Sequence, residues 1–181
     1  MRRSWYYNQM DSFDPEVLSG VRNEVNQFLV ALQPFERDDK DKVDAKKLET
    51  LFRAIMTNLI STNIKERDFF IAPELIDKEM NRGEFILPEG CNLVPHLFFY
   101  KVVEGNVYVP APDPDFSIRI ASNRNAYIDI IENTVGRMLS ERAYYEMQHG
   151  RKDRAMVYLK KVRKDFPEFQ MPRTLLELLE Q

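Results

Sequence analysis

Three prolines at alternate positions constrain the fold of this chain more than any other feature of its sequence. Pro110, Pro112 and Pro114 are separated by single residues. Each proline lacks a backbone N–H and clashes with the preceding helical turn, so the segment fits neither a helix interior nor a central strand. We therefore predict a linker here, with an α+β domain over residues 1–112 and a helical region over residues 113–181.

Two amphipathic helices are predicted early in the first region. Apolar residues recur at three- and four-residue steps over residues 14–33 and again over residues 44–62. Asp14, followed by a proline, is suited to cap the first helix, and Asp44 is suited to cap the second. Pro34 is expected to end the first helix, because a proline disfavours helical geometry in the residue before it.

A small sheet is predicted between the second helix and the prolines. Residues 68–72 form an apolar run of strand length, and residues 97–103 are rich in aromatic and β-branched side chains. Residues 104–106 have the composition of a turn, which would return the chain as a strand over residues 107–109. The sequence thus predicts a mostly helical α+β fold with a small sheet that contains a β-hairpin.

The last third of the chain has the spacing of a tetratricopeptide (TPR)-like helical hairpin. Its small residues, turn glycine and terminating proline stand at the intervals of that repeat: Ala143, Gly150, Ala155, Leu159 and Pro167. Small side chains let two antiparallel helices approach closely, and glycine suits the turn between them. Arg142 and Glu146 depart from the pattern, because large apolar residues are usual at those positions.

Two interpretations of this hairpin stay open. Only one unit is present, whereas a solenoid needs about three to be stable, so the hairpin is expected either to pack on the rest of the fold or to form a peptide-binding groove. If it forms a groove, the residues expected to line it are Arg137, Ser140, Tyr144 and Met147.

Composition excludes several classes of function. Asp and Glu (29) outnumber Lys and Arg (26), which gives a formal net charge of −3, so a nucleic-acid partner is not expected. The single cysteine rules out an intrachain disulfide or a thiolate metal cluster. Neither a phosphate-binding glycine motif nor a metal-binding histidine spacing is present, so no cofactor and no metal are expected. No stretch approaches the roughly 18 apolar residues of a membrane span, so this chain is not expected to insert directly into a membrane.

One pair of side chains, Cys91 and His96, could act as nucleophile and base if the fold brings them together. Cys91 stands five residues before His96, and an acidic loop with Asp113 follows. Catalysis would require these groups within hydrogen-bonding reach of one another. A lone cysteine between a glycine and an asparagine is more often a small packing residue, so no catalytic residue is assigned.

Three ordered motifs carry a resemblance to a known family. The first is Arg2-Arg3-Ser4-Trp5-Tyr6 with a later Leu32-Gln33-Pro34-Phe35, the second is Arg67-Asp68-Phe69-Phe70-Ile71-Ala72-Pro73-Glu74-Leu75, and the third is Leu93-Val94-Pro95 followed by Leu97-Phe98-Phe99-Tyr100-Lys101-Val102. In this order they resemble the soluble C-terminal region of bacterial multi-pass membrane proteins. These are glycosyltransferase-like proteins related to protein O-mannosyltransferases and common in Bacteroidetes.

The resemblance implies a periplasmic or otherwise extracytoplasmic accessory domain in a sugar-transfer context. Its partner would be a protein, or the membrane-embedded part of the same protein, and no catalytic residue carries over to this chain. On this reading the aromatic residues 1–10 belong to a domain that continues upstream of Met1. The alternative is a free-standing TPR-like adaptor that binds a peptide or protein partner, and its single cysteine is compatible with the cytosol.

Overall fold

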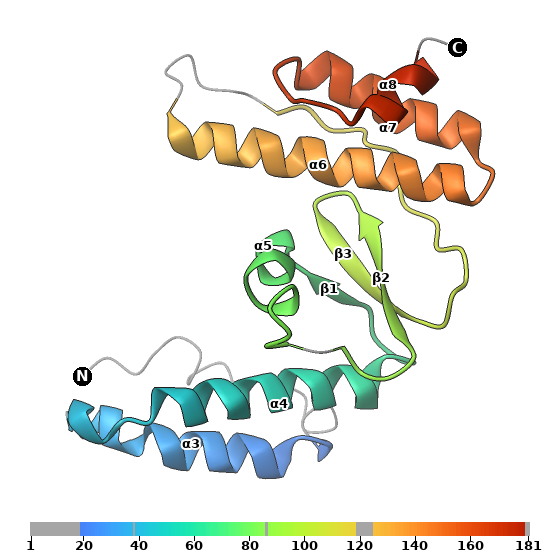
Figure 1. Cartoon of the computed structure of the whole chain (residues 1–181). Helices are drawn as coiled ribbons and strands as arrows, with labels where there is room; N and C mark the ends of the chain where they lie inside the picture. The colour runs from blue at the N-terminus through green and yellow to red at the C-terminus, as the bar shows by residue number, and fades with distance from the viewer. Residues whose placement is uncertain (1–18, 38, 86, 119–124, 180–181) are drawn as a thin grey trace. The chain divides into compact units, whose positions relative to one another are not determined.

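The computed structural model describes residues 19–37, 39–85, 87–118 and 125–179 (Figure 1). They divide into two compact units, the first comprising the described residues up to Arg67 together with Phe85–Glu89, and the second Asp68–Glu84 together with the described residues from Gly90 onward. These residues are mostly helical with one small antiparallel sheet, so the predicted α+β fold class is confirmed. The expectations for residues 1–10 and for a helix start at Asp14 lie outside the described residues.

The first unit contains two amphipathic helices where two are predicted, but the first begins only at Arg22, because Gly20 and Val21 form a turn within the predicted range 14–33. Helix α3 spans Arg22–Glu36 and helix α4 spans Ala45–Asn63, with a short 3-10 turn, η1 (Lys40–Lys42), between them. The backbone N–H of Lys47 donates to the Asp44 carboxylate at 2.9 Å, so the predicted cap of α4 is confirmed.

The predicted end of the first helix at Pro34 is wrong, because α3 continues through Pro34 to Glu36. Pro34 removes one helical hydrogen bond, and only two helical residues follow it, so little of the helix depends on that bond. Carbonyls at the end of the helix still accept hydrogen bonds. The Arg37 N–H donates to the Gln33 carbonyl at 3.1 Å, and the Asp39 N–H donates to the Pro34 carbonyl at 2.9 Å.

The second unit contains a three-stranded antiparallel sheet. Its strands are β1 (Phe69–Ile71), β2 (Cys91–His96) and β3 (Phe99–Glu104), in the order β1-β3-β2. Between β1 and β2 the chain forms a helical turn α5 (Pro73–Leu75) and a π-helical turn η2 (Ile76–Met80). Because β3 is central, both β1 and β2 are edge strands, and Pro95 is tolerated in β2 for that reason.

The predicted β-hairpin lies at a different place from the one expected. Strand β3 turns back on β2, through Leu97 and Phe98, and residues 107–109 form no strand. Leu97 adopts the left-handed conformation (φ 55°) without being a glycine, which is why composition gave no sign of this turn. Gly105 ends the ladder instead, where its N–H donates to the Gly90 carbonyl at 2.8 Å.

The predicted C-terminal hairpin is present. Helix α6 (Ala126–Gln148) and helix α7 (Lys152–Asp165) lie side by side and antiparallel, and α8 (Arg173–Leu179) follows (Figure 1). Gly150 makes the turn at φ +71°, and Ala143 and Ala155 are fully buried where the helices meet. Their neighbours in the core are Val135, Leu139, Tyr158, Leu159, Val162, Phe166 and Leu175.

The hairpin and the sheet belong to the same compact unit, and α6 lies against β2. Residues 105–118 connect them without regular secondary structure, as the prolines predict. The division of the chain into an α+β domain over residues 1–112 and a helical region over residues 113–181 stays a prediction.

Gly136 offers a test of how closely the C-terminal segment packs on α6. A methyl group at this position would lie 2.6 Å from Cγ of Phe169, in the body of the ring. Although alanine favours a helix by about 0.5–1 kcal/mol over glycine, we expect Gly136→Ala to destabilise the protein by about 1–3 kcal/mol in urea unfolding. In a Phe169→Ala background the clash is removed, so the same substitution should become neutral or stabilising. Equal effects in both backgrounds would contradict this packing.

Candidate functional site

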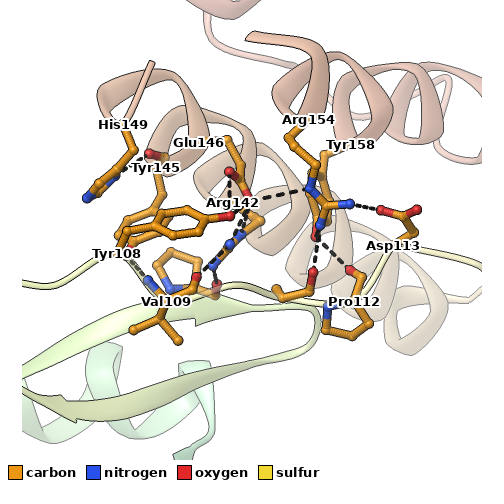
Figure 2. Close-up of polar contacts among 12 residues, drawn as sticks. Tyr108, Val109, Pro112, Asp113, Arg142, Tyr145, Glu146, His149, Arg154 and Tyr158 are labelled. Carbon is orange, nitrogen blue, oxygen red and sulfur yellow. Dashed lines mark hydrogen bonds and ion pairs between the residues drawn. The ribbon is translucent and has the colours of Figure 1, made fainter. Parts of the chain in front are cut away.

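An extended segment of the chain itself lies against the helical hairpin. We call residues 107–116 the strap. Its main-chain groups bond to side chains from both helices of the hairpin, which are Arg142 and Tyr145 from α6 and Arg154, Tyr158 and Lys161 from α7. These polar side chains of the hairpin therefore bind main chain of the same molecule (Figure 2).

Arg142 is the centre of this arrangement. Its guanidinium donates to the Pro95 carbonyl at 3.0 Å and to the Val109 carbonyl at 2.8 Å, and thereby joins the edge strand β2 to the strap. Its Nε and Nη2 donate to one oxygen of Glu146 at 3.0 and 2.6 Å. The side chain is fully buried, so these partners replace all of its hydration.

Glu146 is equally buried and completes the cluster. It stands one helical turn after Arg142, the spacing at which side chains on a helix meet. Its carboxylate accepts a hydrogen bond from the Tyr108 hydroxyl at 3.1 Å, and Arg154 Nε lies 3.9 Å from it. The two positions that depart from the TPR pattern are thus the two that form the buried ion pair.

Helix α7 binds the second half of the strap along one face. Arg154 donates to the Ala111 carbonyl at 2.6 Å and forms an ion pair with Asp113. Tyr158 donates to the Pro112 carbonyl at 2.6 Å, and burial, the main cause, raises the pKa of this phenol above its ordinary value. Lys161 donates to the Phe116 carbonyl. The spacing of these three donors, four and then three residues apart, keeps them on one side of the helix.

Aromatic rings hold the beginning of the strap. Tyr108 stacks on Tyr145 with 5.9 Å between the ring centroids, and His149 packs against Tyr145 at 4.3 Å. The guanidinium carbon of Arg151 lies 3.9 Å from the Tyr108 centroid, a cation–π contact. The N–H of Val109 donates to the Tyr145 hydroxyl at 2.9 Å.

The four residues predicted to line a groove occupy different environments. Arg137 forms an ion pair with Asp77 at 2.8 Å, and Met147 packs against the core of the hairpin. Ser140 is 3% exposed, and its hydroxyl has no partner among the described residues. Tyr144, at 53%, is the one exposed side chain of the four. Their role in binding stays a prediction.

Cys91 and His96 do not form a nucleophile–base pair. They stand at opposite ends of β2, five residues apart, which corresponds to about 17 Å along an antiparallel strand and to opposite faces of the sheet. Burial and the nearby Glu104 raise the pKa of the Cys91 thiol, which disfavours a reactive thiolate. Asp113 is committed to its ion pair with Arg154.

The described residues contain neither a metal-binding cluster nor a membrane-spanning helix, and the chain matches no known family. Within the described part of the chain, no three or more His, Cys, Asp or Glu side chains are placed to hold a metal ion. None of the helices in the described ranges has the length and apolar character needed to cross a bilayer. Comparisons with protein-family models, curated proteins and solved structures find no match to this chain.

Sequence reasoning missed the strap as a bound segment, although two signals for it were present. The prolines were assigned to a linker, and Arg142 and Glu146 were seen only as departures from a repeat. A charged pair at helical spacing in an otherwise apolar stripe indicates a buried polar partner, and a proline-rich segment nearby supplies carbonyls that need donors.

The buried ion pair gives a prediction for stability. Arg142→Met would leave Glu146 buried without its main partner, so we expect a loss of about 3–5 kcal/mol in urea unfolding. The double variant Arg142→Met with Glu146→Leu removes both charges, and we expect it to be more stable than the single variant. Exposed Arg82→Met serves as a control for loss of an arginine and should change stability by less than about 0.5 kcal/mol. A double variant less stable than the single one would contradict the pairing.

His96 gives a prediction for pH dependence. Burial is the main reason that its pKa lies below the ordinary value, and the positive charges of Arg142 and Lys101 act in the same direction, whereas a backbone hydrogen bond and Asp68 partly offset them. The neutral ring is therefore favoured by folding. This stability is present above the unfolded-state pKa of about 6.5 and is lost as pH falls through the folded-state pKa. We expect an NMR titration midpoint below 6.5 and a flatter acid dependence of unfolding in His96→Gln. A midpoint above 6.5 would refute this assignment.

Proposed function

We propose that this chain is a non-catalytic interaction domain that works outside the bilayer, as part of or beside a multi-pass glycosyltransferase-like membrane protein. The observation that carries the proposal is that polar side chains from both helices of the hairpin bind the strap. Arg142 and Tyr158 hold the chain's own backbone, and Glu146 is paired with Arg142, which is a structural use of groups that an enzyme would direct at a substrate.

The remaining surface of the hairpin supports an interaction role. Large apolar side chains are exposed along its helices, with Tyr127 at 72%, Ile130 at 59%, Tyr144 at 53% and Val157 at 40%. Tyrosine and large aliphatic side chains are common anchors where proteins meet, because they bury much area for little loss of rotamer freedom.

The membrane context rests on the resemblance of three ordered motifs, and the structure adds a reason to prefer it to the adaptor hypothesis. A free-standing TPR-like adaptor binds peptides on an open inner face. In this chain the side of α6 that carries Arg142 is occupied by the strap and by β2, and of the four residues expected to line a groove only Tyr144 is exposed. A domain whose hairpin is joined to its sheet in this way is better suited to present an outer surface to a fixed partner.

Site-specific photo-crosslinking tests the proposal. We would replace Tyr144 with p-benzoylphenylalanine in the source organism. Phe70 on the sheet is the matched control position, because it is also aromatic and its exposed fraction, 47%, is close to the 53% of Tyr144. We expect an adduct with a multi-pass glycosyltransferase-like protein, or with the membrane-embedded part of the same protein, from position 144 and not from position 70. Adducts formed only with cytosolic proteins would overturn the proposal. Protease added to spheroplasts should digest the domain from outside.

A further inference from the structure

Positive charge in this chain is concentrated on α7. Seven lysine and arginine residues stand against two aspartates between Arg151 and Asp165, although acidic residues are in excess over the whole sequence, 29 against 26. Such segregation of charge creates a local positive potential on a protein whose net charge is negative.

The cations of α7 fall into two groups. Arg151, Arg154 and Lys161 are committed to the strap. The other four are exposed and form no ion pair with a described residue, and they are Lys152, Lys160, Arg163 and Lys164. Three of these four stand three and four residues apart at the C-terminal end of the helix, which puts them on one side of it.

An apolar groove opens beside Arg163, one of these cations. It has a volume of about 360 Å³ and lies between the end of α7 and the start of α8. Its lining is mostly apolar and comprises Val162, Phe166, Pro167, Phe169, Met171 and Leu176, with Arg163 as the charged member. Leu176 is 42% exposed, so part of this apolar surface faces solvent.

We propose that this groove, the α7–α8 groove, binds an acidic segment of a partner protein that inserts one bulky apolar side chain. The volume is at the lower end of the roughly 300–1,000 Å³ range of ligand pockets, which suits one or two side chains. Carboxylates beside that anchor would meet Arg163 at the groove and Lys160 and Lys164 farther along α7. The apolar anchor itself would enter the groove, as the anchors of other peptide motifs do. A flat anionic bilayer offers no side chain to fill a single hollow, so the concavity favours a peptide.

This inference rests on the proposed function, because it names the partner class of the interaction domain. None of the side chains that donate hydrogen bonds to the strap lines the groove. The groove therefore does not require the buried Arg142–Glu146 pair to open.

Fluorescence anisotropy with a designed probe tests the groove. The probe is a labelled peptide of about twelve residues in which Glu and Asp surround one Leu and one Phe. We expect saturable binding at about 50 mM NaCl that weakens several-fold at about 300 mM, as screening of exposed charges requires. Arg163→Glu should weaken binding at least about fivefold, and Leu176→Asp should do the same by placing a carboxylate in the groove. The matched control Arg82→Glu makes the same charge change outside α7 and should leave binding within about twofold.

Each alternative result overturns the inference. Absence of saturable binding up to about 1 mM, equal binding of a probe with Lys in place of its acids, or equal effects of the substitutions at positions 82 and 163 would do so. Binding to phosphatidylglycerol vesicles without binding to the peptide would reassign the surface to lipid. Circular dichroism of each variant shows whether the fold is retained, and Leu176→Ser provides a milder change if Leu176→Asp unfolds. Peptide binding without a membrane-protein adduct at Tyr144 would support the groove while contradicting the membrane context.

Discussion

A fully buried arginine is the constraint on which the second unit depends. Moving a guanidinium out of water is tolerated only when its donors are matched, and Arg142 is matched by Glu146 and by the carbonyls of Pro95 and Val109. These partners come from three parts of the chain: helix α6, the edge strand β2 and the strap. None of the three can shift without leaving a buried polar group unpaired, so one side chain fixes the sheet, the strap and the hairpin to each other.

The prolines make the strap a suitable partner for such a donor-rich surface. Pro110, Pro112 and Pro114 have no N–H, so the segment presents more acceptors than donors. A row of arginine, tyrosine and lysine side chains on α6 and α7 meets that excess. Fixed proline φ angles also reduce the conformational entropy that the segment loses on folding. The interruption of regular structure that the prolines cause is therefore also what lets the hairpin hold this part of the chain.

Local sequence signals predicted the helices and the hairpin well, because each rests on contacts close in sequence. Asp44 caps α4, Gly150 turns between α6 and α7, and both depend on neighbours a few residues away. The β-turn was misplaced because Leu97 adopts a left-handed conformation that composition does not signal. The hydrogen bonds that hold the strap were missed because they join residues far apart in sequence. Arg142, for example, bonds to Val109, 33 residues away, and to Pro95, 47 residues away. Contacts of that separation leave no periodic trace in one sequence.

The two kinds of cation on the hairpin have different physical roles. Arg142 and Arg154 meet carbonyls and carboxylates of the same molecule, and Arg142 is fully buried among them. Lys160, Arg163 and Lys164 are exposed, and Arg163 lines an apolar hollow. An exposed charge contributes little to stability but steers an oppositely charged partner. One face of the hairpin thus maintains the fold, and the other keeps its charge and apolar surface available. We propose that this division lets a single hairpin act as a contact element without the neighbouring repeats that a solenoid requires.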